Sequence, residues 1–364
     1  MWVRRISVIK LFLVYALFIA NALCNVNDYD ITCKDEKGQN VDWFYLYKLP
    51  GRFDASIQKK GCLYFFITPN SVSSQWTLSE FSLENEKSMA GQTLAQAYFS
   101  ADQVKEDRVL IAYNDEPPNA KGNSKNGHLK GVVVADKRSG FWLVHSVPLY
   151  PNITSDASDY HYPSTGLIYG QSFLCLSLNA NQIDVVGKQL IYNEPQVYES
   201  KLPQSLVEAF PNIQRLIEGK RIINGPYWNE VDLTTLNGEV FKAFAKSSKF
   251  SKELYEDWIA PSLNTNLYVE TWRKGSGNFP SNCTKATRVW NVSKVKFNQS
   301  IFFPTTDDHS KWGVSDDKSD WVCVGDINRA AMQTRRGGGS VCHNSKSISL
   351  SYRALIADFE PCPT

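Results

Sequence analysis

The chain has 364 residues, with 39 basic and 37 acidic side chains and a formal net charge of +2. This near balance excludes a histone-like polycation, so any nucleic acid would be bound by a local groove. The length allows two ordinary domains or one large duplicated domain.

Residues 1–24 have the pattern of a secretory signal peptide, with Arg4 and Arg5 followed by an apolar stretch and small residues near the end. A membrane anchor is the alternative, which we disfavour because the uninterrupted apolar run from Leu11 to Ala20 is shorter than the ~20 residues a span requires. No later segment is long and apolar enough to cross a bilayer. We therefore expect a protein without a membrane anchor in the secretory pathway, either in the lysosome or outside the cell.

Seven cysteines follow the leader without a CxxC pair, and no histidine is placed to complete a zinc site. Disulfides are the better interpretation, although the residues alone leave their connectivity open. We expect no metal and no other cofactor. Predicted glycosylation sites are Asn152, Asn291 and Asn298, with Asn282 as a poorer fourth sequon.

Aromatic and β-branched runs bounded by Gly, Pro and Asp predict strands in the first part of the chain. Helical spacing follows near residues 81–100, 203–220 and 239–258, with Pro211 expected to break the second helix. This interleaving favours an α/β sandwich used twice over an all-β fold. No linker marks the boundary, so we expect tightly packed halves with the site between them. The predicted strands are residues 41–50, 61–69, 108–115, 131–136, 140–148, 266–272, 295–303 and 347–355.

The pattern His-x-Lys occurs twice, at His128 and Lys130 and again at His309 and Lys311. An imidazole supplies a nucleophile or a proton near neutral pH, and a nearby lysine supplies positive charge for a phosphate oxygen. One pair can attack phosphorus while the other protonates the leaving oxygen. A solitary match would be uninformative, but the duplication indicates phosphodiester chemistry.

The sequence resembles the deoxyribonuclease II family of acid endonucleases, within the phospholipase D superfamily of paired His-x-Lys phosphodiesterases. The matching segments are VDWFYLYKLP, GHLKGVVVAD, GFWLVHSVP, YPSTGLIYGQ, KAFAKSSKFSKELYEDWIA, DHSKWGVS, WVCVGDINR and RRGGG, in order along most of the chain. The resemblance implies two similar phospholipase D-like sandwich halves, residues 25–200 and 201–364, packed as a pseudo-twofold dimer within one chain.

The resemblance also implies metal-independent hydrolysis of double-stranded DNA at acid pH, with little sequence preference and with 3′-phosphate and 5′-hydroxyl products. Such an enzyme would degrade DNA in lysosomes, during apoptosis or after secretion. No obligatory protein partner is expected. The alternatives are a catalytically inactive secreted paralogue that binds nucleic acid or a host protein, and a phosphodiesterase acting on lipid head groups. The intact His-x-Lys pairs favour the nuclease.

By analogy with the superfamily, His128 is the predicted nucleophile and His309 the general acid and base, with the reverse assignment left open. Lys130 and Lys311 would stabilise the transition state. His145 aligns with a further histidine that the family uses. It would act either directly or as a strand histidine that orients the site.

Asp308 either orients the imidazole of the histidine after it or forms a turn. Asp326 and Asn328 occupy the region where superfamily members place an acid or amide near the catalytic pair; Asn328 is the better candidate, and a loop shaped by a disulfide is the alternative explanation. Arg335 and Arg336 are candidate phosphate-binding residues, or solvated arginines in a glycine-rich turn.

A stretch of four lysines and three aromatic residues at 242–255 is a further candidate DNA surface if its lysines share one helical face. The other two histidines, His161 and His343, match no shared motif and are expected to be surface or satisfied polar residues. Many relatives have a cysteine where this chain has Gly313, which we interpret as loss of a non-catalytic thiol. The disulfides implied by the resemblance are Cys33–Cys175, Cys283–Cys362 and Cys323–Cys342, with Cys62 left over.

Overall fold

The structure is a computed structural model of the whole chain, and it describes residues 25–51, 61–71, 75–98, 107–153 and 160–363. The predicted signal peptide at residues 1–24 lies outside the described residues. The described part is a mixed α/β structure built on two large sheets, which confirms the predicted class.

The first large sheet is antiparallel throughout. Its central strands are buried on both faces, because alternating side chains enter two different apolar cores: Val133 faces one core, and Val132 and Val134 face the other. In sheet order its strands are β10 (Val197–Lys201), β6 (Val109–Asn114), β7 (Lys130–Ala135), β8 (Ser139–His145), β9 (Gln171–Asn179), β3 (Trp43–Lys48), β4 (Tyr64–Ile67) and β5 (Thr77–Leu78).

Helices cover both faces of this sheet. The helix α3 (Ala180–Asn193) begins where the side chain of Asn179 accepts a hydrogen bond from the N–H of Gln182 at 2.9 Å, and its apolar side chains join the first core. On the other face, α2 (Met89–Leu94) contributes Met89 and Leu94 to the second core.

The second large sheet is antiparallel except for one parallel pair between β13 and β14. In sheet order its strands are β11 (Trp228–Thr234), β12 (Val240–Lys246), β18 (Gly338–Asn344), β17 (Trp321–Gly325), β16 (Trp312–Ser315), β13 (Leu267–Glu270), β14 (Val289–Lys296) and β15 (Phe302–Pro304), and β19 (Ile356–Phe359) also pairs with β14.

Short elements complete the described chain. The helices are α4 (Pro211–Ile217), α5 (Ala260–Ser262) and α6 (Lys346–Arg353), and β1 (Cys33–Lys34) pairs with β2 (Asn40–Val41). The 3₁₀ turns are η1 (Val26–Asp28), η2 (Ser164–Leu167), η3 (Gln204–Leu206), η4 (Ser248–Phe250), η6 (Thr305–Asp307) and η7 (Ala331–Arg335), and η5 (Tyr255–Ile259) is a π-helical turn.

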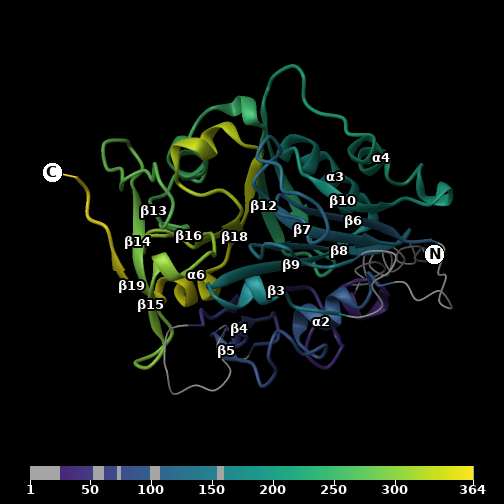
Figure 1. Cartoon of the computed structure of the whole chain (residues 1–364), viewed down its shortest axis with the longest axis horizontal. Coiled ribbons are helices and arrows are strands. Elements are labelled where there is room, and N and C mark those ends of the chain that lie inside the picture. Colours follow the sequence, from purple (N-terminus) through teal and green to yellow (C-terminus); the bar gives the residue numbers. More distant parts are fainter. Residues whose placement is uncertain (1–24, 52–60, 72–74, 99–106, 154–159, 364) are drawn as a thin grey trace, which may run out of the picture.

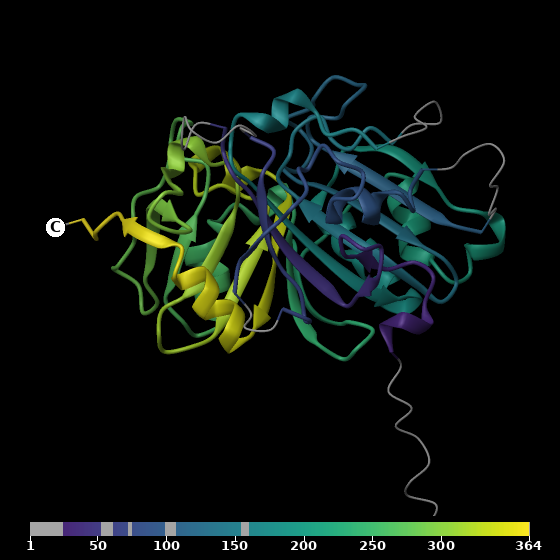
Figure 2. The same ribbon diagram turned by 90° about the horizontal axis from the view of Figure 1, so that it is seen from below.

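The two sheets lie side by side, with β3 to β10 on one side and β13 to β19 on the other (Figures 1 and 2). One continuous apolar core joins them, and it contains Trp43 and Leu178 from the first sheet together with Phe241 and Trp312 from the second. Gln189 of α3 also donates to the backbone carbonyl of Ala243 in β12 at 2.9 Å. The sheets therefore pack tightly, as the absence of a linker predicted.

Three of the predicted elements are wrong. The strand predicted at 295–303 is the end of β14, a turn and the start of β15, which pair with each other as a hairpin. Residues 240–246 form the strand β12, not a helix, because the alternating Phe241, Ala243 and Ala245 are buried in a central strand. Residues 347–355 lie mostly in the helix α6, because the buried Ile348 and Tyr352 are four residues apart and share one helical face. The helical segment predicted at 203–220 is divided at Pro211, as expected, because η3 lies before this residue and α4 begins at it.

The three predicted disulfides, Cys33–Cys175, Cys283–Cys362 and Cys323–Cys342, are present. Cys62 is buried, and its thiol contacts a carboxylate oxygen of Glu84 at 3.1 Å. None of the described helices is long and apolar enough to cross a membrane.

The predicted glycosylation sites differ in exposure. Asn298 is exposed and Asn152 is half-buried. Asn291 is only 1% exposed, and its amide donates to Phe279 O and Glu360 Oε2. The folded chain therefore leaves no room for a glycan at Asn291, which corrects that prediction.

Candidate active site

The first His-x-Lys pair lies where the chain enters β7. His128 is buried, and its backbone N–H donates to Gly337 O at 2.8 Å. Its ring Nδ1 is 2.7 Å from the backbone carbonyl of Asp326. Because a carbonyl only accepts, Nδ1 carries the proton in this contact, and Nε2 keeps the lone pair of the neutral ring.

The second pair lies where the chain enters β16, and it repeats this arrangement. The backbone N–H of His309 donates to Gly170 O at 2.8 Å, and its Nδ1 is 2.9 Å from the carbonyl of Ser146. Each imidazole is thus oriented by a backbone carbonyl of the opposite sheet. In both rings Nε2 is the atom left for chemistry.

The two lysines contact different partners. The Lys130 ammonium bonds the carboxylate of Asp115, whereas the Lys311 ammonium donates to its own neighbour's carbonyl, His309 O, at 2.6 Å. Burial lowers the pKa of Lys311 to about 7, with the Lys130 charge acting in the same direction. The site therefore concentrates positive charge, as a phosphate-binding site requires.

Both imidazoles are electrostatically coupled to these charges. Burial lowers the pKa of His128 to about 3; the Asp115 carboxylate opposes this shift, and Lys130, Lys311 and Arg336 reinforce it. The pKa of His309 is well below its usual range, because of burial and because Lys311, Lys130 and His128 add positive charge. Free of substrate, both rings are neutral except in acid.

Asp115 is a site residue that sequence reasoning missed. Its Oδ2 accepts from Arg336 Nη2 at 3.1 Å and lies 4.0 Å from His128 Nε2. Burial alone would raise the pKa of Asp115, but the charges of Lys130, His128 and Arg336 hold it well below the usual range. The sequence offers a clue, because Asp115 directly follows β6, the strand that pairs with β7.

Arg335 and Arg336, predicted together as phosphate-binding residues, lie in different environments. Arg335 is exposed. Arg336 is bound within the protein, by Asp115 and by the carbonyls of Asn126 and Gly127 at 3.1 Å each. Arg336 thereby fixes the loop that leads to the first histidine.

Asp308 does not contact the imidazole of His309, which Ser146 orients instead. Its carboxylate is buried, accepts from the Ser310 N–H at 3.0 Å in a turn, and bonds the Tyr47 hydroxyl. Ser310 also donates to Glu270 Oε2 at 2.8 Å. The structure therefore supports the alternative in which Asp308 forms a turn.

The remaining predicted residues are Asp326, Asn328 and His145, of which Asp326 and His145 are electrostatically linked to Lys130. Burial raises the pKa of Asp326 to about 8, opposed by the Lys130 charge and a hydrogen bond from the Lys130 backbone. Asn328 is buried, and within the described chain its side-chain oxygen has no hydrogen-bond partner. His145, on β8, accepts from the Val147 N–H at 3.2 Å and is kept neutral, because burial lowers its pKa well below the usual range.

No group of three or more His, Cys, Asp or Glu side chains that could hold a metal ion occurs among the described residues. The predicted DNA surface at 242–255 is not one helical face. Lys242 lies in β12 and pairs with Glu230 and Asp232, whereas Lys246 donates inward to backbone carbonyls such as Gln333 O at 3.0 Å.

The family model for deoxyribonuclease II matches residues 32–362. The chain belongs to the deoxyribonuclease II family. It is 36% identical to deoxyribonuclease-2-alpha of Mus musculus, covering 91% of this chain and 94% of that protein. It is 34% identical to plancitoxin-1 of Acanthaster planci, covering 98% and 99%, and 32% identical to deoxyribonuclease-2-beta of Homo sapiens, covering 91% and 92%. Among solved structures, yeast tyrosyl-DNA phosphodiesterase matches with a TM-score of 0.30 and 10% identity, over 61% of this chain and 67% of that one.

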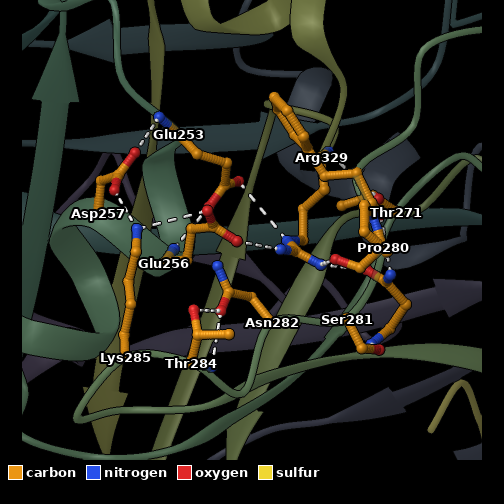
Figure 3. Close-up of polar contacts among 12 residues, drawn as sticks. Glu253, Glu256, Asp257, Thr271, Pro280, Ser281, Asn282, Thr284, Lys285 and Arg329 are labelled. Atoms are coloured by element: carbon orange, nitrogen blue, oxygen red, sulfur yellow. Dashed lines mark hydrogen bonds and ion pairs between the residues drawn. The ribbon is translucent and has the colours of Figure 1, made fainter. Parts of the chain in front are cut away.

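In this deoxyribonuclease II family member, a buried arginine supports the loop that carries Asp326 (Figure 3). Arg329 is 0% exposed; it donates to Glu256 Oε2 at 2.6 Å and to Pro280 O at 3.1 Å, and it lies 3.7 Å from Glu253 Oε1. Its backbone N–H donates to Thr271 Oγ1 at 3.3 Å. These contacts fix the loop whose carbonyl orients His128.

Glu253 has an unusual environment in this cluster. Burial raises its pKa to about 7; Arg329 opposes this shift, and the neighbouring carboxylates of Glu256 and Asp257 reinforce it. The surface edge of the same cluster is tied by Lys285, which bonds both Glu256 and Asp257 (Figure 3). Sequence reasoning missed Glu253 and Arg329, because they lie in separate segments that only the fold brings together.

Proposed function

We propose that this chain is a metal-independent acid endonuclease that hydrolyses DNA through a phosphohistidine intermediate. The observation that carries the proposal is the reciprocal orientation of the two imidazoles, which leaves Nε2 of both His128 and His309 available. The family membership and the names of its relatives supply the DNA substrate.

In the proposed first step, His128 Nε2 attacks phosphorus while His309 Nε2–H protonates the departing 5′ oxygen. The P–N bond forms as the P–O5′ bond breaks. This step leaves the 5′-side fragment, through its 3′ oxygen and phosphorus, on His128 and releases the 3′-side fragment with a 5′-hydroxyl. Water then attacks phosphorus and gives its proton to His309, and the P–N bond breaks to leave a 3′-phosphate. Lys130 and Lys311 balance the negative charge of the phosphoryl oxygens in both steps.

The acid requirement follows from the environment of the proton donor. The pKa of His309 is lowered by burial and by the two lysines, so the ring is protonated only in acid. The negative charge of a bound phosphodiester offsets part of this shift. We propose a supporting role for His145, because its contacts hold it within the sheet.

We further propose that residues 25–200 and 201–364 are structural repeats related by a pseudo-twofold axis. The order β6-β7-β8-β9-β3 matches the order β13-β16-β17-β18-β12, with all neighbouring strands antiparallel and the histidines before β7 and β16. The carbonyls of Ser146 and Asp326 follow β8 and β17, and Gly170 and Gly337 precede β9 and β18. The boundary is supported by β10, which ends at Lys201, and by the disulfides, each of which lies within one half.

The three disulfides and the family support residence in an oxidising compartment. We propose the lysosome or the extracellular space, with DNA degradation as the role.

The test is plasmid cleavage in excess chelator at about pH 5 and about pH 7.5, a range that brackets histidine titration. His128→Ala and His309→Ala should abolish cleavage, whereas His161→Ala, at an exposed histidine, should leave it unchanged. Cleavage that chelator stops, or that survives either catalytic substitution, would contradict the proposal. No cleavage by the folded wild type at either pH would favour the inactive paralogue.

A further inference from the structure

Two aromatic side chains stand directly beside His309. The indole of Trp272 meets the imidazole edge to face, with ring centroids 5.2 Å apart and planes at 72°. Tyr169 packs against the other part of Trp272 at 4.5 Å and 81°. Both rings are half-buried, so each keeps an accessible portion.

Each ring is attached to a fixed point of the site. Tyr169 precedes Gly170, whose carbonyl accepts the backbone N–H of His309 at 2.8 Å. Trp272 follows Thr271, whose hydroxyl accepts the backbone N–H of Arg329. The rings are therefore held in position before any ligand binds, which reduces the entropy lost on binding.

A lysine extends this aromatic surface outward. Lys274 is exposed, donates to the Tyr169 hydroxyl at 3.2 Å and stands 5.3 Å from the centre of that ring. We name Tyr169, Trp272 and Lys274 the aromatic lip. From His309 outward, the side chains follow in the order Trp272, Tyr169 and Lys274.

The neighbourhood of His128 is different. Its ring lies against the carbonyl of Asp326 and the carboxylate of Asp115, and its backbone N–H donates to the carbonyl of Gly337. The phosphate site is thus lined by charged and polar groups beside one histidine and by aromatic rings beside the other.

We propose that the aromatic lip is a nucleobase subsite, which stacks the base on the 3′ side of the scissile phosphate. The inference rests on the proposed function, in which His309 protonates the 5′ oxygen of the nucleotide on that side. In this arrangement the base of that nucleotide stacks on Trp272, the ring next to His309, and the exposed ammonium of Lys274 is assigned to the following phosphate. Every base has a π face, so such stacking tolerates all four bases.

A base stacked on Trp272 has left the DNA stack. The lip therefore favours single strands and weakly stacked steps over regular duplex, because local unstacking costs energy. The identity of the base should have little effect on binding at the lip, whereas the absence of a base should weaken it.

Dinucleotides test this directly, because one phosphodiester fixes the register. The substrates are thymidylyl-thymidine, the analogue with an abasic tetrahydrofuran on the 3′ side, and the analogue with it on the 5′ side. Loss of the 3′-side base should lower kcat/KM of the wild type about 5- to 150-fold, the range for one stacked base. Trp272→Ala should lose a similar factor on the full dinucleotide and nothing further on the analogue lacking the 3′-side base.

Two further variants separate stacking from structure. Trp272→Phe should retain most of the activity, because a ring remains. Trp228→Ala removes an indole that is 44% exposed on β11, and it should change nothing. Equal losses by Trp272→Ala on all three substrates, or a loss that follows the 5′-side base, would overturn the inference.

A binding measurement separates failure of the lip from failure of the proposed function. A dinucleotide with 2-aminopurine on its 3′ side should lose fluorescence on binding to the His128→Asn chain, and Trp272→Ala in that chain should prevent the loss. If the wild type cleaves no dinucleotide but the quenching still depends on Trp272, the lip stands and the proposed catalysis fails. Absent quenching, or quenching that survives Trp272→Ala, refutes the lip.

Discussion

Replacement of Glu253 by glutamine should make the stability of the fold less sensitive to pH. The carboxyl is 5% exposed and packed beside Arg329, Glu256 and Asp257 (Figure 3). Its pKa rises from 4.5 to about 7, mainly through burial. In the unfolded chain the same carboxyl titrates near its usual value, so the two states bind protons differently between these limits.

The sign follows from proton linkage. Below pH 4.5 the carboxyl is protonated in both states, and Glu253 adds no pH-dependent term. As pH rises from 4.5 to the folded pKa of about 7, the carboxyl is ionised in the unfolded chain but still protonated in the folded one, so stability falls across this range and levels off above it. The rise of the pKa from 4.5 to about 7, at 1.36 kcal/mol for each tenfold change in proton affinity, gives a loss of about 3 kcal/mol by neutral pH.

Urea unfolding from pH 4 to pH 8 measures this loss. The difference in unfolding free energy between the wild type and Glu253→Gln should change by about 3 kcal/mol over this range, in favour of the variant as pH rises. Glu218→Gln, at a carboxylate whose side chain is 43% exposed, is the control and should track the wild type. If the difference between the wild type and Glu253→Gln is constant with pH, the carboxyl does not carry the raised pKa and the reasoning is wrong.

Three further predictions concern the site and the surface. Asp115→Asn should lower the pKa of His128, because a carboxylate 4.0 Å from Nε2 stabilises the imidazolium by up to about 4 kcal/mol at an effective dielectric constant of 20. Histidine NMR titration measures this pKa, with Asp184→Asn as the matched buried control. An unchanged or raised pKa of His128 would contradict the prediction. Gly170→Ala should reduce cleavage by on the order of tenfold or more, because its Cβ would lie 2.3 Å from Asp308 Oδ1 and displace the carbonyl that holds His309. Gly313→Ala, whose Cβ would meet nothing closer than 3.7 Å, should retain activity in the same plasmid assay, and equal loss in both would refute the argument. Peptide mapping after enzymatic deglycosylation should find Asn298 converted to aspartate and Asn291 unmodified, whereas a modified Asn291 would show that glycosylation precedes burial of that strand.

Local patterns in the sequence predicted most strands of the first sheet, because alternating aromatic and β-branched residues have few other stable arrangements. They failed at β12, where Lys242, Phe244 and Lys246 obscure a central strand, and at α6, where Ile348 to Tyr352 alternates like a strand but packs like a helix. Tertiary packing decides both cases.

The same division applies to the site. The duplicated motif predicted the histidines and lysines of the candidate site, whereas the groups that orient the two histidines are backbone carbonyls of Ser146 and Asp326, which no residue type reveals. Asp115 and Arg329 were missed because their partners lie far away in sequence, at Arg336 and Glu256.

The exchange of carbonyls between the sheets also bears on biosynthesis. The carbonyl that orients His128 lies 198 residues later in the chain, and the carbonyl that orients His309 lies 163 residues earlier. A nascent chain of which only the first sheet has been synthesised has His128 but lacks the carbonyl that orients it. An isolated second sheet likewise has His309 without its orienting carbonyl. In the proposed mechanism, competence for hydrolysis is then a property of the completed tertiary structure, and a partly synthesised chain lacks it.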